Sequence, residues 1–79
     1  MTEQELIEYL RNELAIETTD VDADTALFSS GRVDSFSLVT LISHIEERCR
    51  FRMSPAEVNL ENLDTVGRIV RFVAEKKNN

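Results

Sequence analysis

The residues best placed for chemistry are Asp34 and Ser35, which stand where a loop meets a predicted helix. Asp34 suits the N-cap position, because its carboxylate can accept a hydrogen bond from an early helical N–H. Ser35 is a favourable site for a phosphate group, since a helix N-terminus offers unpaired N–H groups and the positive end of the helix dipole. The plain alternative is that the two residues only cap the helix.

Phe36, the residue after Ser35, gives this helix start a second unusual feature. With about 100° between successive helical residues, Phe36 points about 160° away from Leu38, which belongs to the apolar stripe of the same helix. The ring is therefore expected to stand in solvent beside Ser35. An aromatic side chain exposed next to an exposed serine favours a docking surface for another protein.

Two segments in the first half of the chain have the spacing of amphipathic helices. The first, residues 3–14, follows Thr2 and has Glu5 three residues later, which is the spacing of a capping box. The second begins near Asp34 and ends near residues 48–50, where arginines favour the negative end of the helix dipole. The apolar stripes consist of Leu6, Ile7, Leu10 and Leu14 in the first segment, and of Leu38, Leu41, Ile42, Ile45 and Cys49 in the second.

A third helix is predicted near the end of the chain. It begins near Val66, with Asp64 or Thr65 as its N-cap. Its apolar stripe consists of Val66, Ile69, Val70 and Val73. No segment of the chain alternates between apolar and polar residues long enough to predict a strand.

Two further segments connect these helices. The run Ser54-Pro55-Ala56-Glu57 combines an N-cap, a proline at the first helical position and a capping-box glutamate, which predicts a short helical turn over about 55–60. Val58 and Leu60 are expected to hold this turn. Residues 15–33 form a loop long enough to need a function or packing of its own. Its apolar anchors are Ile16, Val21, Leu27, Phe28 and Val33.

The chain is therefore predicted to be one all-α domain, residues 1–79, with three main helices, one short helix and a long first loop.

Composition narrows the classes of function. The 79 residues carry fifteen acidic and nine basic side chains, a net charge of −6, which disfavours binding to nucleic acid or anionic lipid. The charge is uneven: residues 1–47 have eleven acids and two bases, or −9, whereas residues 48–79 have four acids and seven bases, or +3. No apolar run exceeds three residues, which excludes a membrane span and makes a cytoplasmic location the simplest expectation.

Other candidate sites have weaker support. Residues 20–24 match the opening of a calcium loop, but Thr25 and Gly31 occupy the positions that require glycine and a bidentate glutamate. His44 lies off the apolar stripe and is expected to be exposed, while Cys49 lies on it and is expected to be buried and inert. With one histidine and one cysteine, the common metal sites cannot be assembled, so no metal is expected.

The residues around Ser35 resemble the modification site of acyl carrier proteins. The matching run is Leu27-Phe28-x-x-Gly31-x-x-Asp34-Ser35-Phe36-x-x-Val39-x-Leu41-Ile42, continued by Phe51-x-x-x-Pro55-x-Glu57 and Glu61-Asn62-Leu63-Asp64-Thr65-Val66. The resemblance implies a four-helix bundle that is not itself a catalyst. It also implies that a magnesium-dependent transferase attaches 4′-phosphopantetheine from coenzyme A to Ser35. The thiol of that arm would carry acyl or aminoacyl groups as thioesters.

The outer face of the Ser35 helix departs from the pattern of general fatty-acid carriers, which usually have Asp-Ser-Leu followed by acidic residues. Here Phe36 follows the serine, and acids return only at Glu46 and Glu47. Electrostatic steering by this helix should therefore be weaker, leaving recognition to Phe36 and shape. The residues expected to dock partners are Asp34, Phe36, Val39, Thr40, Ser43 and Glu47. The Leu-Phe-x-x-Gly-x-x-Asp-Ser arrangement also resembles stand-alone aminoacyl carriers, including D-alanyl carriers.

The leading hypothesis is a discrete, monomeric carrier that serves a lipid, polyketide or specialised pathway. Its partners would be a phosphopantetheinyl transferase and the enzymes that load, transfer or condense the cargo. Two alternatives stay open: an unmodified helical adaptor, and within the carrier class an aminoacyl carrier of the D-alanyl kind. A hydrolase is disfavoured, because His44 is nine residues from Ser35, roughly 13 Å along the same helix.

Overall fold

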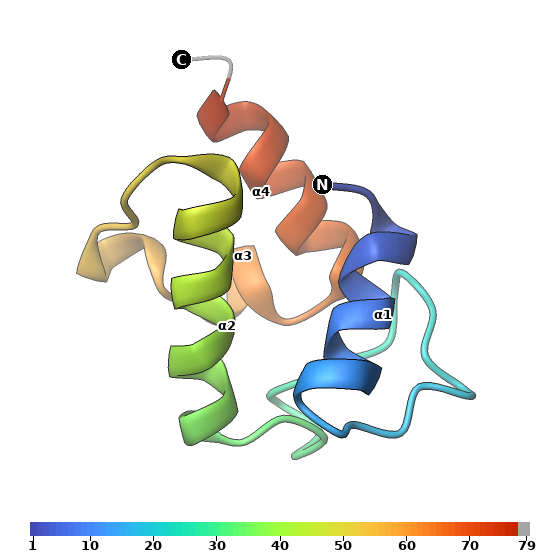
Figure 1. The fold of residues 1–79 in the computed structure, drawn as a ribbon. Helices are drawn as coiled ribbons and strands as arrows, with labels where there is room; N and C mark the ends of the chain where they lie inside the picture. The colour runs from blue at the N-terminus through green and yellow to red at the C-terminus, as the bar shows by residue number, and fades with distance from the viewer. Residues whose placement is uncertain (78–79) are drawn as a thin grey trace.

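The computed structural model describes residues 1–77, and within this range the chain forms helices joined by loops, without strands (Figure 1). The elements are α1 (Glu3–Glu13), α2 (Ser35–Cys49), the 3₁₀ turn η1 (Pro55–Glu57), α3 (Leu60–Leu63) and α4 (Val66–Lys77). The all-α prediction and the positions of the three main helices are confirmed. Helix α4 packs against each of the other three α-helices. No helix in this range has the length and apolar character that crossing a membrane requires.

Local capping explains where α1 begins and ends. The Thr2 N–H donates to Glu5 Oε1 at 3.0 Å and the Glu5 N–H donates to Thr2 Oγ1 at 3.1 Å, so the predicted capping box is present. After the helix, Ala15 adopts a left-handed conformation with a φ of 55°. This turn lets the Ile16 N–H donate to the Leu10 carbonyl at 3.0 Å, which closes the end of the helix.

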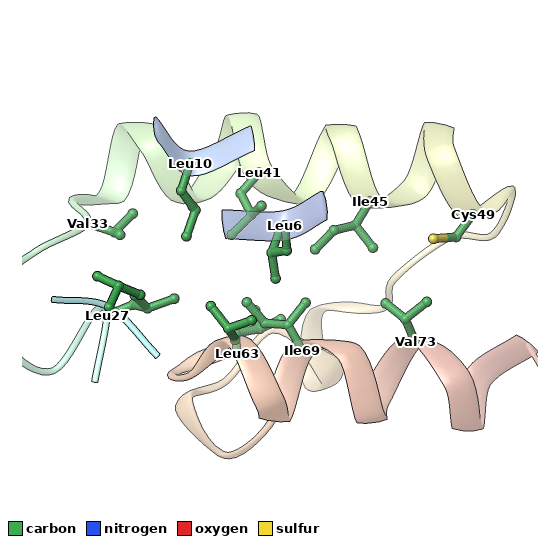
Figure 2. Close-up of a cluster of buried hydrophobic side chains, with 12 residues drawn as sticks. Leu6, Leu10, Leu27, Val33, Leu41, Ile45, Cys49, Leu63, Ile69 and Val73 are labelled. Atoms are coloured by element: carbon green, nitrogen blue, oxygen red, sulfur yellow. The ribbon is translucent and has the colours of Figure 1, made fainter. Parts of the chain in front are cut away.

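The core collects side chains from every helix and from the long loop (Figure 2). Its buried members are Leu6 and Leu10 of α1, Leu41, Ile45 and Cys49 of α2, Leu63 of α3, Val66, Ile69 and Val73 of α4, and Val21, Leu27 and Val33 of the loop. Cys49 is buried, as predicted. The edges of the predicted stripes, including Leu38, Ile42 and Val70, are only half-buried, because each helix covers a limited width of a small core.

The short helical turn predicted over 55–60 is wrong in its extent. Glu57 Oε1 accepts from the Ser54 N–H at 2.8 Å and starts the turn, but η1 ends at Glu57. Asn59 is extended and begins a separate helix, α3, by accepting from the Asn62 N–H at 2.9 Å. Leu60 does not anchor the segment: its side chain is 51% exposed. Leu63 fills the core instead.

Gly67 allows the long loop to approach α4 closely. Its N–H donates to the Ala23 carbonyl at 2.9 Å, and a Cβ at position 67 would lie 3.0 Å from that same oxygen. A larger side chain would push the loop away from the helix. The long loop of residues 15–33, for which the sequence predicts no helix or strand, is thus attached to the first turn of α4.

The sequence predicted that His44 is exposed, and this prediction is wrong. His44 is half-buried, and its ring stacks on Tyr9 of α1 with ring centroids 3.8 Å apart and planes 8° apart. Burial lowers the pKa of His44, the Arg48 charge lowers it further, and the nearby glutamates oppose the shift. The periodicity of α2 alone could not reveal this contact, because the partner ring belongs to another helix.

The left-handed residue after α1 yields a stability prediction. Replacing Ala15 with Gly should raise the free energy of unfolding by about 0.5–1 kcal/mol, since glycine adopts this conformation without the penalty that a Cβ imposes. Urea unfolding measures the change. The matched control is Ala74→Gly at an exposed position of α4, which should lower the free energy of unfolding by about 0.5–1 kcal/mol. A loss of stability in both variants would contradict the explanation.

Candidate functional site

Ser35 is the first residue of α2 and is exposed to solvent. Asp34 precedes it in an extended conformation, and its Oδ1 accepts from the Ser37 N–H at 2.8 Å. The predicted N-cap is therefore confirmed. The hydrogen bond from the Ser37 N–H also lowers the pKa of the Asp34 carboxyl, so this side chain is ionised at neutral pH. The site presents an accessible hydroxyl at the positive end of a fifteen-residue helix.

The outer face of α2 presents apolar groups next to Ser35. Phe36 is 87% exposed and Val39 is 64% exposed, so the predicted exposure of Phe36 is confirmed. The other residues expected on this face, Thr40, Ser43 and Glu47, are exposed as well. The structure therefore brings the predicted docking residues onto one exposed face, which begins at Asp34 and follows α2.

The two acidic residues of α2 differ in what they contact. Glu46 is half-buried, and its carboxylate accepts from the Met53 N–H at 2.8 Å, which fixes the chain that follows the helix. Of these two acids, only Glu47 is exposed to solvent. A shallow hollow of about 460 Å³ at the end of this face is lined by Ser43, Glu46, Glu47, Arg50, Phe51 and Arg52. Acidic and basic charges balance there, in keeping with the weak steering expected from the sequence.

The loop before Ser35 is closed by its own backbone. The Val33 N–H donates to the Leu27 carbonyl at 3.0 Å, and the Gly31 N–H donates to the Phe28 carbonyl at 3.1 Å. Gly31 turns the chain with a φ of 82°, a conformation that favours glycine. The buried side chain of Val33 then holds the loop directly before Asp34.

Asp64 ties this loop to the junction between α3 and α4. Its Oδ1 accepts from the Phe28 N–H at 2.9 Å and the Ser29 N–H at 3.0 Å, and its Oδ2 accepts from the Ser29 hydroxyl at 2.7 Å. The Leu27 N–H donates to the Asp64 carbonyl at 2.7 Å. We call this group of four hydrogen bonds the Asp64 clasp. Thr65, not Asp64, caps α4 by accepting from the Arg68 N–H at 3.0 Å, which decides between the two caps that the sequence allowed.

An apolar cleft of about 170 Å³ opens between the loop, α2 and α3. It is lined by Phe28, Leu38, Val58, Asn59, Leu60 and Leu63. The sequence predicts Leu60 as an anchor of a longer turn and not as part of a site. Leu38 lines this cleft together with Val58 and Leu60, which lie about twenty positions later, so no local pattern in the sequence predicts the cleft.

The acidic run at residues 20–24 is engaged in local structure. Asp22 Oδ1 accepts from the Asp24 N–H at 2.9 Å and from the Thr25 hydroxyl at 3.0 Å. Asp20 forms an ion pair with Arg32, with the closer nitrogen–oxygen distance 2.7 Å. Across residues 1–77, no group of three or more histidine, cysteine or acidic side chains is arranged to hold a metal ion.

Comparison with known proteins places this architecture in a family. The family model described as a phosphopantetheine attachment site matches residues 4–73. The acyl carrier protein of Chlamydia trachomatis serovar D is 31% identical over 67 residues, which cover 85% of this chain and 84% of that protein. The D-alanyl carrier protein of Abiotrophia defectiva is 28% identical over 74 residues, which cover 94% of each.

A solved structure has the same fold. Its description is "Crystal structure of FAD-dependent dehydrogenase", and the alignment has a TM-score of 0.75 and 26% identity, covering 86% of this chain and 97% of that one. The chain belongs to the phosphopantetheine-binding acyl carrier protein family. It is a carrier protein, and its prosthetic group is a covalently attached 4′-phosphopantetheine.

The Asp64 clasp predicts how stability responds to acid. Desolvation by itself would raise the pKa of Asp64, but donation from Ser29 and Phe28, with the nearby Arg68 charge, outweighs it and leaves the pKa below its usual range. Because the folded chain holds the charged form more tightly, the clasp stabilises the fold above the ordinary carboxyl pKa of about 3.9 and loses this contribution as the pH falls further. Asp64→Asn should therefore lower the free energy of unfolding more at pH 7 than at about pH 3.

Urea unfolding at the two pH values measures this difference. The matched control is Glu75→Gln, which removes an exposed carboxylate near the C-terminal end of α4, eleven positions after Asp64. An Asp64→Asn penalty that is equally large in acid would show that the charge of Asp64 contributes nothing.

Proposed function

We propose that Ser35 carries the 4′-phosphopantetheine arm, and that the chain is a single-domain, monomeric carrier working in the cytoplasm. The arm supplies a terminal thiol that holds acyl or aminoacyl groups as thioesters. The observation that carries the proposal is the exposed Ser35 hydroxyl at the start of α2, directly after the Asp34 cap and beside the 87% exposed Phe36. The carrier does no chemistry on its cargo; its partner enzymes do.

The residues at the helix start fit the attachment of this group. Ser35 Oγ would form a new bond to the phosphorus that bears the pantetheine arm of coenzyme A. The bond from that phosphorus to the bridging oxygen breaks, adenosine bisphosphate leaves, and the serine proton passes to the transferase or to solvent. The resulting phosphodiester is an anion next to the N-terminus of α2, where the helix dipole favours negative charge.

The outer face of α2 is the proposed docking surface for the transferase and for the enzymes that load and receive the cargo. It consists of Asp34, Phe36, Val39, Thr40, Ser43 and Glu47. Burial of Phe36 and Val39 in an apolar recess of the partner would supply most of the binding free energy, because aromatic anchors dominate such interfaces. Charge would contribute less, since Glu46 is occupied by the Met53 N–H.

The cargo and pathway are proposed only by class. The similar proteins include both acyl carriers and a D-alanyl carrier, which supports acyl or aminoacyl cargo in lipid, polyketide or specialised biosynthesis. We include FAD-dependent dehydrogenases among the candidate partner enzymes, because a chain of this fold occurs in a structure described by that name.

Modification in vitro tests the attachment site. Incubation with coenzyme A, magnesium and a phosphopantetheinyl transferase should add one phosphopantetheinyl group, read by intact-protein mass spectrometry. Ser35→Ala should gain no mass, because the only nucleophile in the proposed position is removed. Ser37→Ala, two residues further along the same helix, is the matched control and should be modified.

Two outcomes would contradict the proposed attachment site. One is that wild type gains no mass with several different transferases. Labelling of Ser35→Ala to the same extent as wild type would place the attachment elsewhere.

Replacement of Phe36 tests the docking surface. Phe36→Ala should lower the kcat/KM of the transferase, because it removes the exposed aromatic anchor beside Ser35. The free energy of unfolding should change by less than about 0.5 kcal/mol, as expected for an exposed position. Steady-state kinetics and urea unfolding provide the two measurements.

The control for this experiment is Phe72→Ala. The Phe72 ring packs edge-on against Phe51 with ring centroids 6.2 Å apart, so its loss should cost stability without affecting the docking of the folded protein. A loss of about 3–5 kcal/mol in Phe36→Ala, the scale of a core phenylalanine, would show that Phe36 supports the fold.

A further inference from the structure

The direction in which Ser35 is presented depends on a loop with no regular secondary structure. Val33 is two residues before Ser35, and its N–H is paired with the Leu27 carbonyl at 3.0 Å. The position of Leu27 therefore sets the position of Val33, and through it the start of α2. Leu27 and Val33 are buried next to one another at one end of the core (Figure 2).

The Asp64 clasp holds the Leu27 end of this loop in place. The Asp64 side chain receives three hydrogen bonds from Phe28 and Ser29, between 2.7 and 3.0 Å, while its carbonyl receives the Leu27 N–H at 2.7 Å. Asp64 is 7% exposed and stands between Leu63, buried in the core, and Thr65, which caps α4. The buried junction between α3 and α4 is thus connected by hydrogen bonds, through Leu27 and Val33, to the residues that precede Ser35.

We propose that Asp64 is a positioning residue for the modification of Ser35, which it presents to the transferase by holding the preceding loop in one conformation. This inference rests on the proposed attachment at Ser35. Asp64 takes no part in the transfer itself: none of its hydrogen bonds within residues 1–77 is to Ser35 or to the outer face of α2. Its effect is to reduce the number of conformations from which the transferase must select.

This role predicts a particular kinetic signature. When only a fraction of the molecules presents Ser35 correctly, the apparent affinity for the transferase falls by that fraction, whereas the reaction of the bound complex is unchanged. Asp64→Ala removes all three side-chain hydrogen bonds and should raise KM on the order of tenfold with little change in kcat. Asp64→Asn retains an oxygen that can accept from the Phe28 and Ser29 N–H groups, so it should rescue most of this loss.

A control must separate presentation from stability. Val73 is buried at the opposite end of the core from Val33, beside Cys49 (Figure 2). Val73→Ala should therefore destabilise the fold without touching the loop. All variants are assayed at a temperature and pH at which circular dichroism shows them to be fully folded, with coenzyme A, magnesium and one transferase that modifies wild type.

Amide hydrogen exchange gives a readout that does not depend on activity. The Val33 N–H, which is bonded to Leu27, should exchange faster in Asp64→Ala than in wild type or in Val73→Ala of equal or lower stability. The expected result is a raised KM and faster Val33 exchange in Asp64→Ala alone, with recovery in Asp64→Asn.

Two results would overturn the inference. One is an unchanged KM in folded Asp64→Ala, and the other is the same rise in Val73→Ala, which would assign the effect to stability. Failure of the proposed function looks different, because wild type itself would then not be modified by any transferase.

Discussion

The candidate site depends on the nineteen residues 15–33, which connect α1 to α2 without forming a helix. This loop must be held in one place, because its last residues set where α2 begins. Residues 15–33 have no regular hydrogen-bonding pattern of their own. Three buried side chains, Val21, Leu27 and Val33, attach the loop to the core, and backbone and side-chain hydrogen bonds attach it to α4 and its approach. The Gly67–Ala23 contact and the Asp64 clasp therefore fix a segment that no helical hydrogen bonds hold.

Helix α2 has two faces with separate tasks. Leu41, Ile45 and Cys49 are buried against the core, while Phe36 and Val39 remain exposed on the other side. Phe36 and Val39 lie three residues apart on the same exposed face, and an exposed apolar patch of this kind is typical of a protein-interaction site. The proposed docking of partner enzymes beside Ser35 fits this patch. The same arrangement keeps the only cysteine inside the core, away from the thiol chemistry of the prosthetic group.

Helix α2 carries few acidic side chains, so this chain differs from a carrier that attracts its partners by charge. The net charge of −6 belongs largely to α1 and the long loop, and several of these acids are used locally. Hydrogen bonds hold the pKa values of Asp20 and Asp22 low, the first through Arg32 and the second through the Asp24 N–H. Of the two acids within α2, Glu46 is bonded to the Met53 N–H, so Glu47 alone adds an exposed acidic charge to the outer face beyond the Asp34 cap. Apolar shape should therefore decide which enzymes recognise this carrier.

The sequence by itself determined the three main helices, the N-caps of α1 and α2 and the exposed Ser35–Phe36 pair, because helical periodicity and capping depend on residues at most four positions apart. Two predictions from the sequence were wrong. Leu60 does not anchor a longer turn, because Asn59 starts a new helix at that point. His44 is not exposed, because its ring stacks on Tyr9 of another helix. The sequence could not choose between Asp64 and Thr65 as the cap of α4. Only the tertiary structure decided that choice, because the hydrogen bonds that occupy Asp64 come from residues 35 and 36 positions earlier in the chain. Long-range contacts of this kind produce no periodic pattern in the sequence, so the sequence could not predict how the loop before Ser35 is held in place.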